Sequence, residues 1–248
     1  MKLKAIIVDD EPLAREIVSK FLIGNNKVEI VEECGDGFQA LKAIRELKPD
    51  LVFLDIQMPK LDGFELLEVL EQRPEIIFAT AYDQFAIKAF EMNAVDYLLK
   101  PFSKERLEAA LEKAVKRIES KAEMPQPNID RMREQYDAAR GTIDRVVTRL
   151  GSKVTVIAVD KIWYVESQDD YVMIYSELGN HLKEKTMKYF EEHLPADTFV
   201  RIHRSYIINL SQIAAIEPYT KDTHIVTLKC GAKLRASSEG YKKLRTYL

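Results

Sequence analysis

The chain has 248 residues, of which 46% are hydrophobic and 31% are charged, and its net charge is −3 at pH 7. This length predicts about two soluble globular domains. No apolar stretch approaches the ~20 residues of a membrane-spanning helix, and the first residues resemble a strand rather than a signal peptide, so we expect no membrane insertion. Cys34 and Cys230 share no metal-ligand spacing and are compatible with the reducing cytoplasm, where we expect the protein to act.

Residues 1–120 alternate between short apolar runs and segments with helical spacing. The apolar runs, which are typical of buried strands, cover 3–8, 28–31, 51–54, 76–79 and 95–99. The helical segments cover 12–22, 38–47, 64–70, 84–92 and 103–118. This five-fold alternation predicts an α/β fold in which a parallel sheet is covered by helices on both faces.

Polar residues stand at the ends of the predicted strands, at the edge where open α/β sheets bind ligands. Asp9 and Asp10 follow the first strand, Asp55 follows the third, and Thr80 and Lys100 follow the fourth and fifth. Three carboxylates in one cleft repel one another unless a cation neutralises them, and their oxygens suit Mg²⁺. A carboxylate can also attack phosphorus, and a metal, an ammonium and a hydroxyl can then stabilise the developing charge. We therefore predict a phosphoryl-transfer site around Asp55.

The motifs at these strand ends closely resemble the receiver domain of two-component response regulators. They are Val8-Asp9-Asp10-Glu11-Pro12, Leu54-Asp55-Ile56-Gln57-Met58-Pro59, Asp62-Gly63, Thr80-Ala81 and Asp96-Tyr97-Leu98-Leu99-Lys100-Pro101-Phe102. The resemblance implies a flavodoxin-like receiver domain over 1–120, with a five-stranded parallel sheet of order 2-1-3-4-5.

The same resemblance implies how the site binds its ligands. Asp55 is the phosphoacceptor and takes a phosphoryl group from a sensor histidine kinase or a small acyl phosphate. Asp10, Asp55 and the backbone carbonyl of Gln57 bind Mg²⁺, and Asp9 lies nearby through water.

The resemblance also implies a switch on phosphorylation. Lys100 contacts the phosphoryl oxygens, next to a Lys-Pro peptide bond that is usually cis in the family. Thr80 is drawn toward these oxygens and Tyr97 turns inward, which remodels a nearby face and supports a homodimer.

The second half of the chain has a different pattern. Residues 121–143 contain two prolines and few apolar positions, which predicts a partly helical linker. From 144 to 248 the predicted strands cover 154–159, 162–165, 171–175, 199–202, 206–209, 213–217 and 224–228, with short helices at 187–193 and 239–248. We therefore predict a mainly β domain without a long recognition helix.

Basic residues gather near the C-terminus, where the chain from Arg201 onward has 9 lysines and arginines against 3 acidic residues. This indicates a polyanion partner, with a chance surface imbalance as the alternative. Strand alternation places Arg201, His203 and Ser205 on one face, so Arg204 points elsewhere unless the strand ends there. Such side chains can bind base edges or phosphates, whereas the alternative is an edge strand with solvated basic residues.

Two motifs in this half resemble the LytTR-type DNA-binding domain. They are Glu166-Ser167-x-x-Asp170-Tyr171-Val172 and Arg201-x-His203-Arg204-Ser205-Tyr206-x-x-Asn209. The resemblance covers 144–248 and implies an elongated β structure whose loops enter the major groove. The DNA-contacting positions of the family map onto His203 and Arg204 and, more loosely, onto Asp170, Tyr171, Ser237 and Ser238. The whole chain resembles LytR/AlgR-type regulators, near those that are partnered with LytS-type membrane kinases.

These features favour a phosphorylation-dependent transcriptional regulator that binds promoter DNA at direct or inverted half-sites. Lys242 and Lys243, on the predicted terminal helix, are candidates for phosphate contacts. Haloacid-type phosphatases also use an aspartate nucleophile, but they need a second acid two residues later, where this chain has Gln57. We therefore expect no enzyme activity beyond the phosphorylation and dephosphorylation of the receiver itself. A receiver that controls a protein-binding β module, without direct DNA readout, is the alternative.

Overall fold

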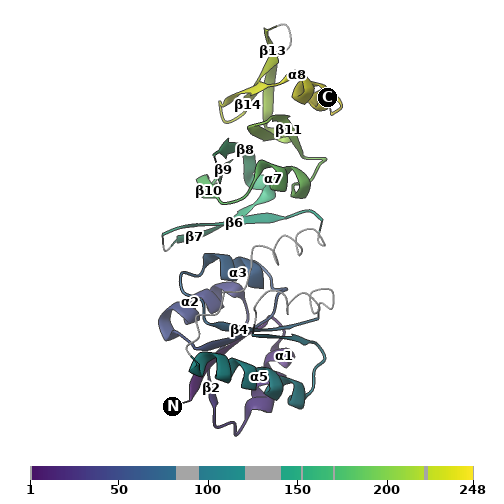
Figure 1. Cartoon of the computed structure of the whole chain (residues 1–248). Coiled ribbons are helices and arrows are strands. Elements are labelled where there is room, and N and C mark those ends of the chain that lie inside the picture. The colour runs from purple at the N-terminus through teal and green to yellow at the C-terminus, as the bar shows by residue number, and fades with distance from the viewer. Residues whose placement is uncertain are drawn as a thin grey trace. The chain divides into compact units, whose positions relative to one another are not determined.

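The structure is a computed structural model that describes residues 2–81, 95–120, 141–151, 153–169, 171–220 and 223–247. The chain divides into two compact units, Met1–Gln135 and Tyr136–Leu248, whose elements are traced in Figure 1. Within the described ranges, no helix combines the length and the apolar character that crossing a membrane requires. The linker predicted over 121–143 falls mostly outside these ranges and stays a prediction.

The first unit alternates strands and helices, as the sequence predicts. Its elements are β1 (Leu3–Val8), α1 (Pro12–Leu22), β2 (Val28–Cys34), α2 (Gly37–Leu47), β3 (Leu51–Leu54), α3 (Gly63–Val69), β4 (Glu75–Thr80), β5 (Asp96–Leu99) and α5 (Lys104–Glu119). The strands pair in parallel in the order β2-β1-β3-β4-β5. This order confirms the predicted fold, while the helix predicted over 84–92 lies outside the described residues.

Helices cover both faces of this sheet, with α1 and α5 on one side and α2 and α3 on the other (Figure 1). Ile7 and Phe53 pack toward α1 and α5 in one apolar cluster, and their neighbours Ile6 and Val52 are fully buried as well. Strands that are buried on both faces are apolar throughout, which is why their positions could be predicted. Strand β2 runs to Cys34, beyond the predicted 28–31, because an edge strand can carry exposed acidic residues.

Asp96 joins β5 to α5 through two cationic side chains. Its carboxylate is fully buried and accepts hydrogen bonds from Arg106 Nη1 and Nη2, at 2.8 Å each, and from Lys113 Nζ at 2.9 Å. Burial alone would raise the pKa of Asp96, but the bonds from Arg106 and Lys113 outweigh it and hold the pKa below its ordinary value. The ion pairs therefore stabilise the first unit above the ordinary carboxyl pKa and are lost as the pH falls through the lowered one.

Asp96→Asn should destabilise the first unit by about 1–3 kcal/mol at neutral pH, because two cations lose their buried acceptor. The loss should shrink as the pH falls below the ordinary carboxyl pKa and through the lowered pKa of Asp96, where the wild-type carboxylate also becomes protonated. The measurement is urea unfolding followed by far-UV circular dichroism, which is dominated by the helices of the first unit. Fluorescence of the single tryptophan, Trp163, reports on the second unit and should not change. A difference in the free energy of unfolding between the variant and the wild type that is the same at every pH would contradict the prediction.

The second unit is mainly β, as predicted. Its elements are β6 (Arg145–Leu150), β7 (Lys153–Ala158), the short 3-10 helix η2 (Val159–Lys161), β8 (Ile162–Gln168), β9 (Tyr171–Ser176), β10 (Gly179–Lys183), α7 (Met187–His193), β11 (Phe199–His203), β12 (Tyr206–Asn209), η3 (Leu210–Gln212), β13 (Ile213–Thr220), β14 (Thr223–Leu228), β15 (Lys233–Ala236) and α8 (Ser238–Arg245). The strands form a five-stranded sheet of order β10-β9-β8-β12-β11, a three-stranded sheet β13-β14-β15 and the hairpin β6-β7.

Sequence analysis missed β6, β10 and β15. Each mixes polar and apolar residues, and β10 and β15 lie at sheet edges, where side chains are partly exposed. Such strands are stabilised by pairing with their neighbours rather than by local apolar content. Among the described residues of the second unit the longest helix is α8, with 8 residues, so no long recognition helix is found there.

Candidate functional site

The C-terminal ends of β1, β3 and β5 bring three carboxylates and one lysine together. Oxygens of Asp9, Asp10 and Asp55 all lie within 4.8 Å of one another. Lys100 Nζ lies 2.7 Å from Asp9 Oδ2 and 2.8 Å from Asp55 Oδ2. Asp9 and Asp55 are buried, whereas Asp10 is exposed. The structure thus assembles the cluster that the strand ends predict.

The start of α3 holds the loop that follows Asp55. Asp62 and Glu65 form a capping box, in which each side chain accepts a backbone N–H of the other at 2.8 Å. A Cβ at Gly63 would lie 2.5 Å from the carbonyl oxygen of Asp55, so this close approach requires glycine. Within the loop, the backbone N–H of Gln57 donates to Asp55 Oδ1 at 3.3 Å, and the Gln57 side chain is exposed.

One ammonium does not balance three carboxylates, so the cluster keeps an excess of negative charge. Burial raises the pKa of Asp9, although the hydrogen bond from Lys100 acts in the opposite direction. Burial alone would lower the pKa of Lys100, but its bonds to Asp55 and Asp9 outweigh this effect and raise it. Lys100 is therefore protonated at neutral pH, and the remaining carboxylate oxygens form a hard, anionic donor set that fits a divalent cation such as Mg²⁺.

In the second unit, the segment with Arg201, His203 and Arg204 forms the hairpin of β11 and β12. Strand β11 ends at His203, and Arg204 and Ser205 form the turn. Of the two possibilities left open by strand alternation, the strand therefore ends before Arg204, whose side chain is exposed. The backbone N–H of Ser205 donates to His203 Nδ1 at 3.2 Å. Burial and the neighbouring Arg204, Arg235 and Arg201 lower the pKa of His203. The ring is therefore neutral at neutral pH and carries its proton on Nε2.

Two other segments with predicted contact residues lie beside this hairpin. The backbone N–H of Ser167, near the end of β8, donates to the carbonyl of Ser205 at 3.0 Å, which brings the turn between β8 and β9 close. Tyr171 begins β9 and is 41% exposed, whereas Asp170 lies outside the described residues. Ser237 caps α8 by accepting from the backbone N–H of Gly240 at 3.0 Å. The other predicted residues of α8, Ser238, Lys242 and Lys243, are all exposed.

Comparison with known proteins identifies both units. Residues 5–112 match the family model of the response regulator receiver domain, and residues 152–248 match that of the LytTr DNA-binding domain. The chain is 35% identical to the sensory transduction protein LytT of Bacillus anthracis, over 99% of both chains. It belongs to the two-component response regulators with a LytTR DNA-binding domain. It is also 34% identical to the transcriptional regulatory protein BtsR of Salmonella typhi, over 98% of both chains.

A solved structure, the response regulatory domain of the protein mrkE from Klebsiella pneumoniae, is 38% identical to this chain. It covers 48% of this chain and 99% of its own length, with a TM-score of 0.43.

Two further predicted residues of the receiver domain, Thr80 and Tyr97, stand on β4 and β5. Thr80 ends β4, and its hydroxyl is fully buried without a hydrogen-bond partner in the described part of the chain. Buried polar atoms normally have a partner, so this hydroxyl is a candidate for binding a phosphoryl oxygen. Tyr97 is buried on β5, with its ring 6.1 Å from that of Phe78, and its inward turn on phosphorylation stays a prediction. The Lys100–Pro101 peptide bond is cis, as the resemblance implies.

In the LytTR domain, Arg235 is a basic residue that sequence analysis did not select. It lies exposed on β15, close enough to His203 to lower the pKa of that ring, and its guanidinium stands 5.9 Å from the ring centroid of Tyr219. Lys233 and Arg235 are exposed while Leu234 and Ala236 are buried, which is strand alternation. This alternation could have indicated β15, and Arg235 on it, from the sequence, but sequence analysis missed both.

Proposed function

We propose that this response regulator accepts a phosphoryl group on Asp55 from a sensor histidine kinase, and that phosphorylation drives a homodimer whose LytTR domains bind promoter DNA. The observation that carries the proposal is the buried Asp55 carboxylate, held 2.8 Å from Lys100 and beside Asp9 and Asp10. The proposal places the protein in the cytoplasm, where DNA and a kinase's phosphoryl group are both accessible.

The residues of the site have complementary roles in the transfer. An oxygen of Asp55 attacks phosphorus, forming an acyl phosphate, while the bond from phosphorus to the donor breaks. Lys100 stabilises the negative charge of the phosphoryl oxygens, and the buried Thr80 hydroxyl donates to one of them. Asp10, Asp55 and the Gln57 carbonyl would hold Mg²⁺, with Asp9 nearby. When bound, Mg²⁺ supplies positive charge beside the transferred group.

Lys100→Gln should destabilise the receiver domain by about 2–3 kcal/mol in the absence of Mg²⁺, because Asp9 and Asp55 lose their ammonium partner. Adding Mg²⁺ should restore part of this loss and stabilise the variant more than the wild type, since the cation takes over the neutralisation. The measurement is urea unfolding followed by far-UV circular dichroism, with and without Mg²⁺. Lys104→Gln is the control, because Lys104 forms an exposed pair with Glu108 at 3.8 Å. An equal effect of Mg²⁺ on the Lys100 variant and the wild type would count against the proposed site.

An apolar surface next to the site suits a protein phosphodonor. Leu13 and Ile17 on α1 are 73% and 45% exposed. They border a cavity of about 340 Å³ that Lys100 and Phe102 also line. A docked partner would bury these side chains within reach of Asp55 and contribute hydrophobic stabilisation. This surface supports a sensor kinase as the donor, and the similarity to LytT favours a LytS-type membrane kinase.

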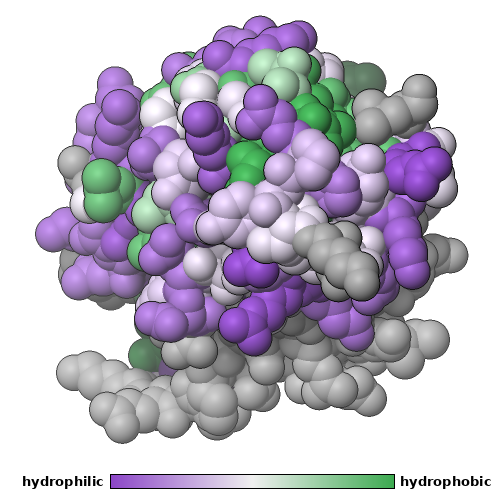
Figure 2. Space-filling view, turned by 90° about the horizontal axis from the view of Figure 1, so that it is seen from above, coloured by the Kyte–Doolittle hydropathy of each residue, from purple (hydrophilic) through white to green (hydrophobic). Residues whose placement is uncertain are grey.

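The C-terminal end of the LytTR domain, with β13, β14 and α8, supports DNA rather than an apolar protein partner. Figure 2 views this end and shows hydrophilic residues around much of it, with pale and hydrophobic residues near the middle. The exposed Arg204, Arg235, Lys242 and Lys243 supply positive charge for phosphates and donors for base edges. Two copies on direct or inverted half-sites about one helical turn apart would lie on one face of the duplex.

A titration of the full chain tests the proposal. The DNA is a duplex that the wild-type chain selects from a random pool, compared with a scrambled duplex of equal length. We expect acetyl phosphate with Mg²⁺ to strengthen binding to the selected duplex, and sedimentation with beryllofluoride to show a dimer. Equal affinity for both duplexes would exclude specific readout, and a selection that recovers no bound DNA would favour the protein-binding alternative. An unchanged monomer with and without beryllofluoride would contradict phosphorylation-driven dimerisation.

A further inference from the structure

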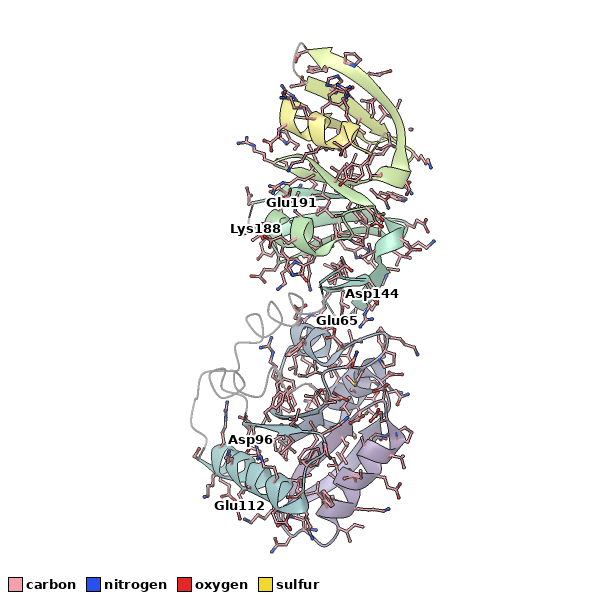
Figure 3. All side chains as sticks on the ribbon, turned by 90° about the vertical axis from the view of Figure 1, so that its right-hand side faces the viewer. Glu65, Asp96, Glu112, Asp144, Lys188 and Glu191 are labelled. Carbon is pink, nitrogen blue, oxygen red and sulfur yellow. The ribbon has the colours of Figure 1, made fainter. Side chains whose placement is uncertain are left out.

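Glu191 on α7 is an acidic residue within the basic part of the LytTR domain. Its Oε2 accepts a hydrogen bond from Arg201 Nη1 at 2.6 Å, and its Oε1 lies 3.4 Å from Lys243 Nζ. Figure 3 shows Glu191 on α7, one turn after Lys188. Burial alone would raise the pKa of Glu191, but Arg201 outweighs this effect and lowers it, so the carboxylate is charged at neutral pH. Glu191 therefore links α7 to both β11 and α8.

Arg201 extends this link to the tip of the hairpin. Its Nη2 donates to the carbonyl oxygen of Arg204 at 2.9 Å, and its Nε donates to that of His203 at 3.4 Å. All three guanidinium nitrogens of Arg201 thus have a partner inside the domain. Because the guanidinium is planar and its donors are fixed in direction, one ion pair with Glu191 sets the position of both turn carbonyls.

The start of α8 holds the end of β11, just before the turn. The backbone N–H of Ser237 donates to the carbonyl oxygen of Ile202 at 2.9 Å. A Cβ on Gly240 would overlap this oxygen, so the helix packs directly against the β11 backbone. The end of β11 and the turn are thus both held by contacts within the domain, while the Arg204 side chain remains exposed.

We propose that Glu191 and Arg201 are positioning residues for DNA recognition. Glu191 orients Arg201, and Arg201 fixes the turn from which the Arg204 side chain and His203 Nε2 reach DNA. Arg201 itself does not contact DNA. This inference rests on the proposed function, because it requires that the LytTR domain of this chain bind DNA.

The proposal predicts that Glu191→Gln weakens specific DNA binding, whereas simple charge repulsion predicts that it strengthens binding. Removing an acidic residue from a basic surface should strengthen binding to a polyanion, because repulsion of the phosphates falls. If Glu191 positions the turn, Glu191→Gln should instead weaken specific binding, because glutamine keeps the shape but loses the charge-assisted bond to Arg201. Binding to scrambled DNA depends mainly on phosphate contacts and should stay the same or rise slightly.

The test titrates the full chain and its variants onto the selected and scrambled duplexes at two salt concentrations. We expect Glu191→Gln and Arg201→Ala each to lower the affinity for the selected duplex about tenfold. The double variant should be no weaker than either single one, since both act through one chain of contacts. The salt dependence for Arg201→Ala should match that of the wild type, because no phosphate contact is lost.

Glu192→Gln is the matched control, since Glu192 is the next residue of α7 and pairs with Lys188 at 3.6 Å on the exposed side. It removes the same charge and should bind the selected duplex at least as tightly as the wild type. Arg201→Lys separates the charge of Arg201 from the geometry of its guanidinium, and it stays informative even if the other variants fold poorly. A lysine keeps the charge but loses the three-nitrogen geometry, so we expect the affinity to fall about tenfold as well.

Three results would overturn the inference. The first is a Glu191→Gln affinity for the selected duplex equal to that of Glu192→Gln. The second is a salt slope for Arg201→Ala smaller by about one, which would mean that Arg201 contacts a phosphate. The third is an Arg201→Lys variant that binds like the wild type. Equal affinity of the wild-type chain for both duplexes is a different failure, because it refutes the proposed function and the inference with it.

Discussion

Asp55→Asn should abolish the Mg²⁺-dependent labelling of the full chain by acetyl phosphate. An amide cannot form the acyl phosphate, and the substitution keeps the size and shape of the buried side chain. The neighbouring carboxylates, Asp9 and Asp10, follow β1 rather than β3, and Asp10 is exposed whereas Asp55 is buried. Intact mass spectrometry would measure the fraction of the chain that gains one phosphoryl group.

Asp50→Asn is the control for this experiment. Asp50 directly precedes β3 and Asp55 directly follows it, so the two variants remove the same charge from opposite ends of one strand. Asp50 accepts the backbone N–H of Lys4 at 2.8 Å, and the side-chain oxygen of an asparagine can accept the same bond. This control should be labelled like the wild type. Full labelling of Asp55→Asn would mean that another residue is the phosphoacceptor.

The acidic cluster could be predicted from sequence because of the geometry of parallel sheets. Runs such as Leu51–Leu54 are apolar at every position, since helices cover both faces, and this makes their ends visible in the sequence. The carboxyl ends of parallel strands share one edge, so Asp9, Asp55 and Lys100 were expected together although they are far apart in the chain. The burial of the Thr80 hydroxyl, which has no partner among the described residues, could not be predicted, because it depends on what surrounds the end of β4.

The DNA-binding half was harder to predict because its sheets are antiparallel and partly exposed. The polar edge strands β10 and β15 carry no apolar run, and Arg235 was missed with β15. The contact between Glu191 and Arg201 joins a helix to a strand ten residues later through tertiary packing, with no local motif to indicate it. Strand alternation grouped Arg201 with His203 and Ser205 as candidates for DNA contact, but the contacts of Arg201 within the domain set it apart from the exposed Arg204.

Arg204→Ala should weaken binding to the selected duplex by about 1–3 kcal/mol and relax the base preference at one position, if its guanidinium reads a base edge. The substitution should leave the turn intact, because Arg201 holds residue 204 through its backbone carbonyl, at 2.9 Å, rather than through its side chain. The measurement is a titration of the full chain on the selected duplex and on single-base variants of it, at two salt concentrations.

Lys242→Ala provides the contrast that separates base readout from phosphate contact. Lys242 is exposed on α8, so it can reach a phosphate without affecting the hairpin. Its loss should lower the affinity evenly across sequences and reduce the salt slope by about one, whereas Arg204→Ala should lose affinity mainly on the selected duplex. If Arg204→Ala instead shows the even loss and the smaller slope, Arg204 contacts a phosphate. Sequence readout would then have to come from other donors near the turn, of which the neutral His203 with its proton on Nε2 is the nearest.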